Sequence, residues 1–497
     1  MTTDWTPLTD EEFAATGLDE SFKGFAFWND DGFLVTLCVH KDAPLFSACR
    51  SGHRLMQRPS PQEPIPGNQR AAFRKRFASG CRFVGRQVRA LTALLLLSGL
   101  LIALFLLFGS TTLSRHNALP AAMLDEASFP LADIKKPIRF RVGNPAAEAA
   151  LANEFADSWK RERTYLAMQN SDGPLPPTAF LAISGGGDQG AFGAGILCGW
   201  TTVGNRPQFK LVTGISTGAL IAPFAFLGSA YDSKLKTFYT TTSSADVLKA
   251  RNLLTGLTSD AMADTQPLRD LLRKHVNRAF LDAVATEYTK GRELWIATTE
   301  LDNLQRYIWN LSLIATSRDP AATDLFISLM IASASIPGAF PPVLIDVEAG
   351  GRSYQEMHVD GGATAQVFVY PVGLDFEALA AEHNASRQRE LYVIRNARLD
   401  PEWAQIERKT LDIASRAIDS LIQTQGVGDL YRIYLAAKRD NLNFNLAYIP
   451  ASFNAPHKEP FNPEFMRALF TVGHDLAVKG YPWEKTPPDY ALSRHPR

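Results

Sequence analysis

Cysteine and excess charge are both scarce in this sequence. Its 497 residues include four cysteines, and only Cys198 lies in the long C-terminal part, so we expect no disulfide framework there. The four cysteines show no metal-ligand spacing, and no metal site is predicted. Lys plus Arg and Asp plus Glu both total 51, so the chain lacks the basic footprint of a nucleic-acid-binding protein.

One long run contains no charge at all, residues 90–109 (ALTALLLLSGLLIALFLLFG). This length is enough to cross the hydrocarbon core of a bilayer, whereas a buried core helix of this length would show some polar face. Of the nearby cations only Arg115 follows the run closely. The cations that precede it are Arg70, Arg74, Lys75, Arg76, Arg82, Arg86 and Arg89.

The positive-inside rule therefore predicts a single-pass membrane protein with a cytoplasmic N-terminus. Everything after about residue 110 is expected on the opposite, periplasmic or extracellular side. A cleaved signal peptide is the alternative. We favour an uncleaved anchor, because the run is longer than a typical signal-peptide core and has no clear small-x-small cleavage site.

The chain divides into four predicted segments. Residues 1–69 have no assigned role and end in a Pro-rich linker, although a β-hairpin is expected around 25–39. Residues 70–110 hold the basic flank and the transmembrane helix, and 111–175 read as a tether with a helical lead-in. In residues 176–490 strands alternate with helices, which predicts an α/β domain with a mostly parallel sheet.

Further elements of this domain are predicted from apolar spacing. We expect strands at 179–184, 210–213, 293–299, 306–309, 390–394 and 443–449, and helices at 189–200, 219–227, 265–276, 325–335 and 404–424.

A Gly-x-Ser-x-Gly motif lies between a predicted strand and a predicted helix, at Gly214, Ser216 and Gly218. A tight turn at this place exposes the serine hydroxyl, and the glycines leave room for the turn. The helix that follows directs its N-terminus at the serine, which favours developing negative charge there. The motif makes Ser216 the candidate nucleophile.

A glycine-rich turn follows the strand at 179–184 and contains Gly185, Gly186, Gly187 and Gly190. Its spacing also fits a dinucleotide fingerprint, but no Asp or Glu occurs between Ala191 and Ala230 to hold a ribose. No Gly-Lys-Ser/Thr follows either, which excludes a phosphate loop. The remaining interpretation is a nest of backbone N–H groups suited to an oxyanion.

The base that would serve Ser216 is not settled by these patterns. His383, His457, His474 and His495 are possible partners in the order of a Ser-Asp-His triad, but none lies in a strong turn context. Asp360 is a second kind of candidate. It ends a strand and precedes Gly361 and Gly362, which let the backbone turn close to another element.

Taken together, these motifs resemble those of the patatin-like phospholipase family, over residues 178–375. The family's glycine-rich oxyanion hole is similar to residues 185–190 (GGGDQG), its nucleophile elbow to 214–218 (GISTG) and its Asp-Gly-Gly motif to 360–362. Residues 332–341 (ASASIPGAFP) resemble a fourth family block. The sequence departs from the family at Gln189, where an Arg or Lys is usual, and this leaves the preference for phospholipid over neutral ester open.

The resemblance implies a three-layer α/β/α fold and a catalytic dyad of Ser216 and Asp360 that uses no histidine. It also implies an oxyanion hole at Gly185, Gly186 and Gly187, and no metal or organic cofactor. Residues 219–228 and 325–345 contain candidates for an acyl pocket, although ordinary core packing explains most of them.

The expected function is a membrane-anchored lipid acyl hydrolase of phospholipase A or lipase type. Its partners would be a lipid or acyl-ester substrate and the membrane, with no nucleic acid, and its oligomeric state is left open. Two alternatives remain, a serine esterase or thioesterase acting on soluble acyl esters, and a non-catalytic lipid-binding membrane protein.

Overall fold

The computed structural model describes residues 115–490 except 130, 132, 172 and 252–258, together with 6–7, 26–28, 34–38, 47–48, 95 and 97–99. The chain forms two units, Met1–Thr111 and Thr112–Arg497. The predicted transmembrane segment 90–109 lies almost entirely outside the described residues. Within the described part of the chain, no helix combines the length and apolarity that a bilayer crossing requires.

The first unit contains a small four-stranded sheet. Strands β2 (Ala26–Trp28) and β3 (Leu34–Cys38) pair antiparallel around residues 29–33, where the sequence predicted a hairpin. Strands β1 (Thr6–Pro7) and β4 (Ser47–Ala48) pair with β2 and β3 respectively.

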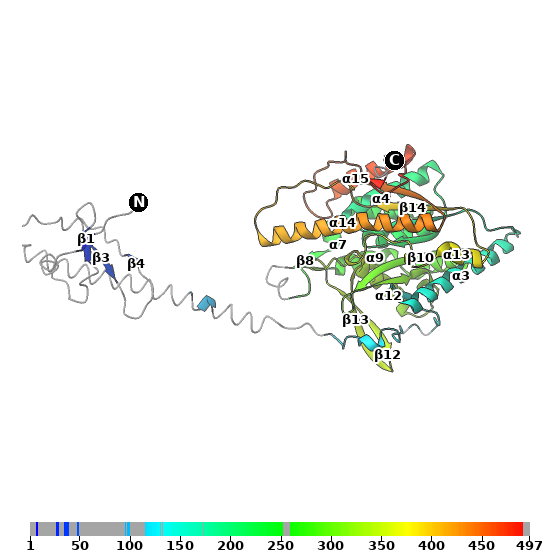
Figure 1. The fold of residues 1–497 in the computed structure, drawn as a ribbon, viewed down its shortest axis with the longest axis horizontal. Helices are drawn as coiled ribbons and strands as arrows, with labels where there is room; N and C mark the ends of the chain where they lie inside the picture. The colour runs from blue at the N-terminus through cyan, green and yellow to red at the C-terminus, as the bar shows by residue number, and fades with distance from the viewer. Residues whose placement is uncertain are drawn as a thin grey trace, which may run out of the picture. The chain divides into compact units, whose positions relative to one another are not determined.

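The second unit is built on a nine-stranded mixed sheet (Figure 1). Five neighbouring strands, in the order β10-β7-β6-β14-β15, are parallel, and β5, β11, β12 and β13 join antiparallel. The strands are β5 (Arg139–Arg141), β6 (Thr178–Ile183), β7 (Phe209–Gly214), β10 (Glu293–Glu300), β11 (Gln305–Asn310), β12 (Val343–Ala349), β13 (Arg352–Asp360), β14 (Arg389–Arg395) and β15 (Leu442–Tyr448).

Helices cover both faces of this sheet, because successive strand residues point to opposite sides. Leu181 and Ile183 of β6 belong to one hydrophobic cluster, and Phe180 and Ala182 belong to the other. The first cluster is closed by α4 (Gly190–Val203), α5 (Thr217–Leu227), α9 (Gln266–His275), α10 (Arg278–Thr289), α12 (Ala321–Ser333) and α15 (Pro463–Val478). The second is closed by α3 (Pro145–Met168), α13 (Phe376–Glu382) and α14 (Thr410–Arg439). The predicted α/β fold with a mostly parallel sheet is therefore confirmed, and the sheet with a layer of helices on each face makes three layers.

Shorter helices fill the connections between these elements. They are α6 (Asp232–Thr241), α7 (Ser244–Val247) and α11 (Leu311–Thr316), with two-residue strands β8 (Lys249–Ala250) and β9 (Ala263–Asp264) between α7 and α9.

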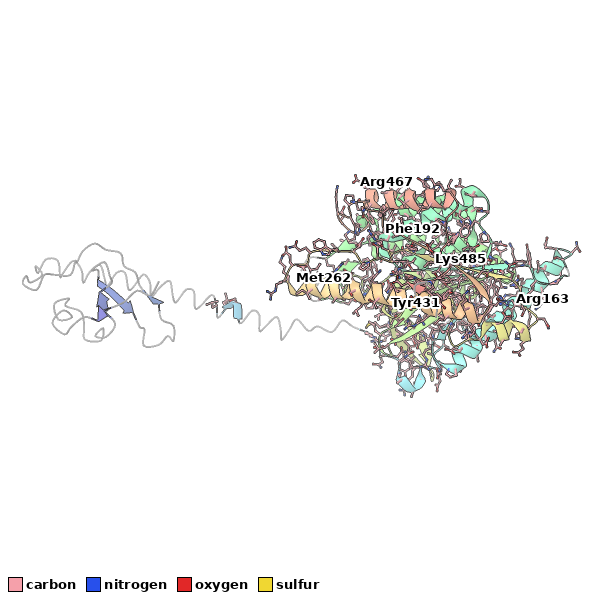
Figure 2. The ribbon with its side chains drawn as sticks, turned by 45° about the horizontal axis from the view of Figure 1, so that its top comes forward. Arg163, Phe192, Met262, Tyr431, Arg467 and Lys485 are labelled. Atoms are coloured by element: carbon pink, nitrogen blue, oxygen red, sulfur yellow. The ribbon has the colours of Figure 1, made fainter. Side chains whose placement is uncertain are left out.

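Helices α4 and α15 pack side by side at short range (Figure 1). A Cβ atom at Gly195 would collide with the Phe470 carbonyl oxygen, and one at Gly199 would collide with the His474 carbonyl oxygen. Figure 2 labels Phe192 of α4, which is fully buried between these helices and the sheet, and Arg467 on the outer side of α15. The glycines of α4 thus have a packing role beyond the turn that precedes the helix.

The structure departs from the predicted elements in three places. In the segment 111–175 the expected helical lead-in is present as α3, but the part expected as a tether contributes β5 to the sheet. The predicted helix at 404–424 begins only at Thr410 and continues to Arg439. The hairpin of β12 and β13 and helix α15 were not predicted as such.

Candidate active site

Ser216 lies two residues after the end of β7 and directly precedes the first residue of α5. Its φ of 55° is unusual for a residue other than glycine and marks the sharp turn that the sequence predicted. The side chain is almost completely buried. A Cβ at Gly214 would collide with the carbonyl of Gly218, so the turn can close only because this position has no side chain.

The strained backbone of Ser216 is held by helix α12. The Ser216 N–H donates to Oγ of Ser333 over 3.1 Å, and Ser333 Oγ donates to the Ala297 carbonyl of β10 over 2.7 Å. Ser333 is part of the 332–341 block, for which sequence reasoning had assigned no role. In the structure, Ser333 positions the turn that carries Ser216.

Asp360 comes to Ser216 through the register of β10. Gly214 at the end of β7 is opposite Ile296, and Asp360 at the end of β13 is opposite Thr298. The two strands occupy successive stretches of the same edge of β10, so their ends converge. Asp360 is further fixed by its own N–H, which donates to the Ser335 carbonyl over 2.9 Å.

Burial raises the pKa of the Asp360 carboxyl to about 7, against the hydrogen bonds from the Ser216 hydroxyl and the Gly362 N–H. The latter bond, to Asp360 Oδ1, is 2.7 Å long. No cation of the described chain forms an ion pair with this carboxyl. A carboxyl that titrates near neutrality beside a buried serine hydroxyl can accept that hydroxyl's proton.

The glycine-rich loop approaches Ser216 from β6. A Cβ at Gly185 would lie 3.1 Å from Ser216 Cβ, so a side chain there would crowd the hydroxyl. Gly186 has φ of 149° and faces the carbonyl of Asn396, and Gly187 has φ of 58°. Gly190, which opens α4, packs against Thr217.

The N–H groups of this loop are not equivalent. The Gly185 N–H donates to the Gln366 carbonyl over 3.0 Å and is therefore occupied. The N–H groups of Gly186 and Gly187 have no partner among the residues that the structure describes. Of the three N–H groups predicted to form the oxyanion hole, only those of Gly186 and Gly187 are therefore available to a ligand.

Gln366 links the motifs that the sequence had placed apart. Its side-chain amide donates to the Gly362 carbonyl over 2.8 Å and to Gln425 Oε1 of α14 over 2.9 Å. Its backbone N–H donates to Asp429 Oδ2 over 2.7 Å. No motif marks Gln366, Gln425 or Asp429, so sequence reasoning missed all three.

None of the described histidines is hydrogen-bonded to Ser216. His383 stacks at an angle against Trp159, and His474 lies 3.3 Å from its neighbour Asp475. His457 contacts Asp188 of the glycine-rich loop, with 2.7 Å between Nε2 and Oδ2. His495 lies outside the described residues.

A small apolar pocket adjoins Ser216 and Gly187, with a volume of about 30 Å³. From the two stretches proposed as acyl-pocket walls, Leu220, Ile336 and Phe340 line it, and most of the others are core. Since one water molecule needs about 10–15 Å³ on this measure, the pocket holds at most a few waters. A long acyl chain requires its walls to move apart.

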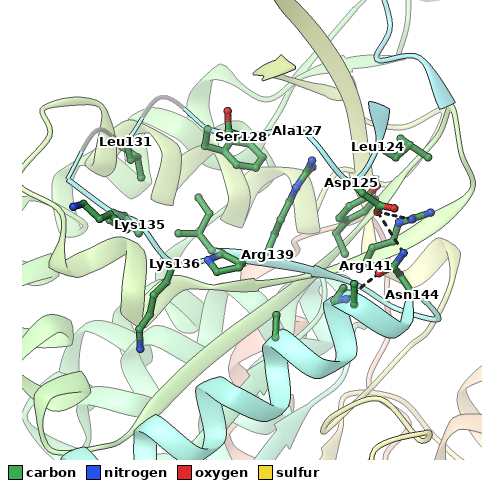
Figure 3. Close-up of a pocket in the computed structure, with 18 residues that line it drawn as sticks. Leu124, Asp125, Ala127, Ser128, Leu131, Lys135, Lys136, Arg139, Arg141 and Asn144 are labelled. Atoms are coloured by element: carbon green, nitrogen blue, oxygen red, sulfur yellow. Dashed lines mark hydrogen bonds and ion pairs between the residues drawn. The ribbon is translucent and has the colours of Figure 1, made fainter. Parts of the chain in front are cut away.

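A larger cavity, of about 400 Å³, lies elsewhere, between residues 124–150 and Tyr307 (Figure 3). Two of the cations that line it are paired with acids, Arg141 with Asp125 at 2.7 Å and Lys136 with Asp157 at 2.6 Å. None of the predicted site residues lines it. In the described part of the chain, no group of three or more His, Cys, Asp or Glu side chains could hold a metal ion.

Comparison with known proteins agrees with this geometry. Residues 181–372 match the family model of the patatin-like phospholipases. This stretch contains every glycine, serine and aspartate motif described above. No curated protein sequence matches the chain.

Solved structures similar to this chain include VipD from Legionella pneumophila, with 11% identity, 61% of this chain and 66% of that chain covered, and a TM-score of 0.30. The complex of full-length SpcU with full-length ExoU from the type III secretion system of Pseudomonas aeruginosa matches with 14% identity, 62% and 52% coverage and a TM-score of 0.29. Human GIVD cytosolic phospholipase A2 matches with 9% identity, 58% and 52% coverage and a TM-score of 0.25. The chain thus spans between half and two thirds of the length of these proteins.

The chain carries a patatin-like phospholipase domain at residues 181–372. At such low identity and TM-scores, the assignment rests on the family model.

Proposed function

We propose that this protein is a membrane-anchored lipid acyl hydrolase that cleaves carboxylic esters through a dyad of Ser216 and Asp360. The observation that carries the proposal is the pairing of a buried serine hydroxyl with a buried carboxyl whose pKa is raised to about 7. The family match supports a lipid ester as the substrate.

In the proposed reaction, Asp360 accepts the proton of Ser216 as the serine oxygen attacks the ester carbonyl. The free N–H groups of Gly186 and Gly187 stabilise the tetrahedral oxyanion, at about 3–4 kcal/mol for each donor in comparable sites. The alcohol part of the lipid leaves with a proton returned by Asp360. Water then attacks the acyl-enzyme by the same route and releases a fatty acid.

The membrane anchor is the second part of the proposal. Residues 90–109 would span the bilayer, and the preceding cations would keep the N-terminus in the cytoplasm. The catalytic domain would then act on the opposite side. This topology can be tested with single cysteines engineered at residues 60 and 120 and a thiol reagent that does not cross membranes. In intact cells we expect labelling at residue 120 alone. Labelling at residue 60 alone would reverse the proposed topology.

Labelling with a fluorophosphonate serine probe tests the chemistry. The detergent-solubilised full chain is compared with Ser216→Ala, Asp360→Asn and the matched control Ser335→Ala, whose buried hydroxyl is bound to the Ile331 carbonyl instead. Labelling should vanish in Ser216→Ala, fall strongly in Asp360→Asn and persist in the control.

Other outcomes separate the alternatives. A folded wild-type protein that takes no label would contradict the hydrolase proposal and favour a lipid-binding role. Labelling that survives in Asp360→Asn would keep the enzyme but remove the dyad. Hydrolysis limited to short soluble esters across a chain-length series would favour an esterase or thioesterase.

A further inference from the structure

The amino-terminal part of helix α14 presents an apolar face that the described chain leaves uncovered. Ile413, Ile418 and Leu421 are 53%, 55% and 70% exposed, and Ile422 is also exposed. Large aliphatic side chains grouped in this way on a surface mark a binding region, whereas single exposed ones need no explanation.

The face is continuous because of helical spacing. Residues 413, 417 and 421 form one row along the helix, and 414, 418 and 422 form the adjacent row, and all six are Ile, Leu or Ala. The charged and polar residues Asp412, Arg416 and Asp419 occupy the opposite side. This is the pattern of an amphipathic helix.

A tryptophan is exposed close to the amino-terminal end of α14. Trp403, in the segment before α14, is 87% exposed. It is held beside the helix, because Arg416 donates a hydrogen bond to the carbonyl of Glu402. The Arg416 guanidinium therefore fixes this segment through a backbone carbonyl, while the indole ring of Trp403 is left in solvent. Tryptophan prefers the boundary between headgroups and acyl chains in membranes.

The position of this surface relates it to the site. In Figures 1 and 2 the amino-terminal end of α14 reaches past the strands of the central sheet. Further along the same helix, Gln425 accepts a hydrogen bond from Gln366, which also binds the Gly362 carbonyl beside Asp360. Four residues separate Leu421 from Gln425, about one helical turn.

We propose that the apolar face of α14 at residues 413–422 lies in the surface layer of a lipid bilayer. An amphipathic helix of this kind lies in the plane of the membrane with its apolar face at the boundary of the acyl chains. The proposal rests on the proposed function, since the neighbouring site takes its ester from that layer. Acids outnumber bases around the face, so the contact depends on apolar burial and needs no anionic lipid.

Site-specific fluorescence tests the contact without using catalysis. The full chain, with Cys38, Cys49 and Cys81 changed to serine, receives either Leu421→Cys or the matched control Asp419→Cys on the polar side of the same helix. Each is labelled with an environment-sensitive dye and placed in phosphatidylcholine vesicles that contain a spin-labelled acyl chain. The dye at 421 should be quenched at least about twofold more than the dye at 419.

Equal quenching at the two positions would overturn the proposal. So would a blue shift at 421 that depends on protein concentration and occurs without vesicles, because a second copy of the chain would then cover the face.

An activity ratio separates this proposal from the proposed function. In the double variant Ile418→Gln/Leu421→Gln, the rate on vesicle phospholipid divided by the rate on a soluble short-chain ester should fall about tenfold. The variant Ser420→Gln, on the polar side, should keep the ratio. An unchanged ratio in the double variant contradicts docking, whereas a wild type that hydrolyses neither substrate contradicts the proposed function and leaves the quenching result valid.

Discussion

The two ends of strand β7 both hold buried ionisable groups, but their surroundings differ. At the amino end, Lys210 of β7 pairs with Glu162 of α3 at 2.8 Å, and Arg387 forms two further bonds to the same carboxylate at 2.6 and 2.8 Å. At the carboxyl end, Asp360 beside Ser216 has only a hydroxyl and an N–H as partners.

The pKa values follow this difference. Burial acts to raise the pKa of Glu162, but Arg387 and Lys210 outweigh it and hold the pKa below its ordinary value. Burial of Asp360 is not compensated by any cation among the residues that the structure describes, and its pKa rises to about 7. A buried carboxylate with two cations is fixed in its charged form and suits structure, whereas one without a cation can exchange a proton near neutral pH.

The largest expected effect comes from removing the uncompensated carboxyl. Asp360→Asn should lower kcat by roughly 10³-fold or more, because Ser216 loses its proton acceptor. The equally buried Asp440, which is paired with Arg439 at 2.7 Å, supplies the control Asp440→Asn. Steady-state hydrolysis of an acyl ester should show the loss only in the first variant, and a similar loss in both would contradict the contrast.

Removing the carboxylate of Glu162, which is paired with two cations, should lower stability rather than activity. Glu162→Gln leaves two buried cations without their shared anion, and we expect a loss of about 3–5 kcal/mol in the free energy of unfolding. Denaturant unfolding measures this loss. The folded enzyme should keep a kcat close to that of wild type, and a large drop in kcat at full folding would show that the amino end also serves the chemistry.

The support of the serine turn gives a smaller effect. Ser333→Ala leaves the Ser216 N–H without its acceptor, at a cost of about 1–3 kcal/mol. Because the turn carries the nucleophile, we expect kcat to fall roughly tenfold, while KM changes little. Ser333→Thr retains a hydroxyl and should restore part of the rate; failure of both variants to change kcat would remove Ser333 from the positioning of Ser216.

The effect of pH is graded rather than all-or-none. Asp360 works as a base only when ionised, so the rate should fall about tenfold for each pH unit below about 7. The stability of the folded protein changes with pH in the opposite direction to the rate. Since the folded pKa is raised above its ordinary value of 3.8, the stability contributed by protonated Asp360 is lost as pH rises through about 7.

Melting curves check this reversed sign. Asp360→Asn should gain thermal stability over wild type on the alkaline side of 7 and lose that advantage in acid. A pH-independent difference between the two proteins would contradict a raised pKa at Asp360.

The sequence predicted the elements around Ser216 well, because strands buried on both faces are continuous apolar runs and end at glycines. It predicted less well where tertiary contacts override local preference. Gly426 and Gly428 discourage a long helix, yet α14 continues through both to Arg439. A Cβ at Gly426 would overlap the guanidinium of the buried Arg395, so the glycine that local preference disfavours leaves room for this side chain.

Some missed features did leave a signal. Strand β12 alternates buried Ile345, Val347 and Ala349 with exposed neighbours, and Gly350 and Gly351, both with positive φ, join it to β13 as a two-glycine hairpin turn. No sequence signal marked the hydrogen-bonded partners Gln366, Gln425 and Asp429, because their role depends on segments that are distant in sequence.

The sequence by itself determined the α/β class, the order of the motifs and the two residues proposed for the chemistry. Only the tertiary structure decided that Gly185 is no free donor, that Ser333 holds the serine turn and that Asp360 lacks a cation. The physical reason is that hydrogen-bond occupancy and pKa depend on which groups meet in space. Register along β10 sets those meetings, and no local pattern encodes it.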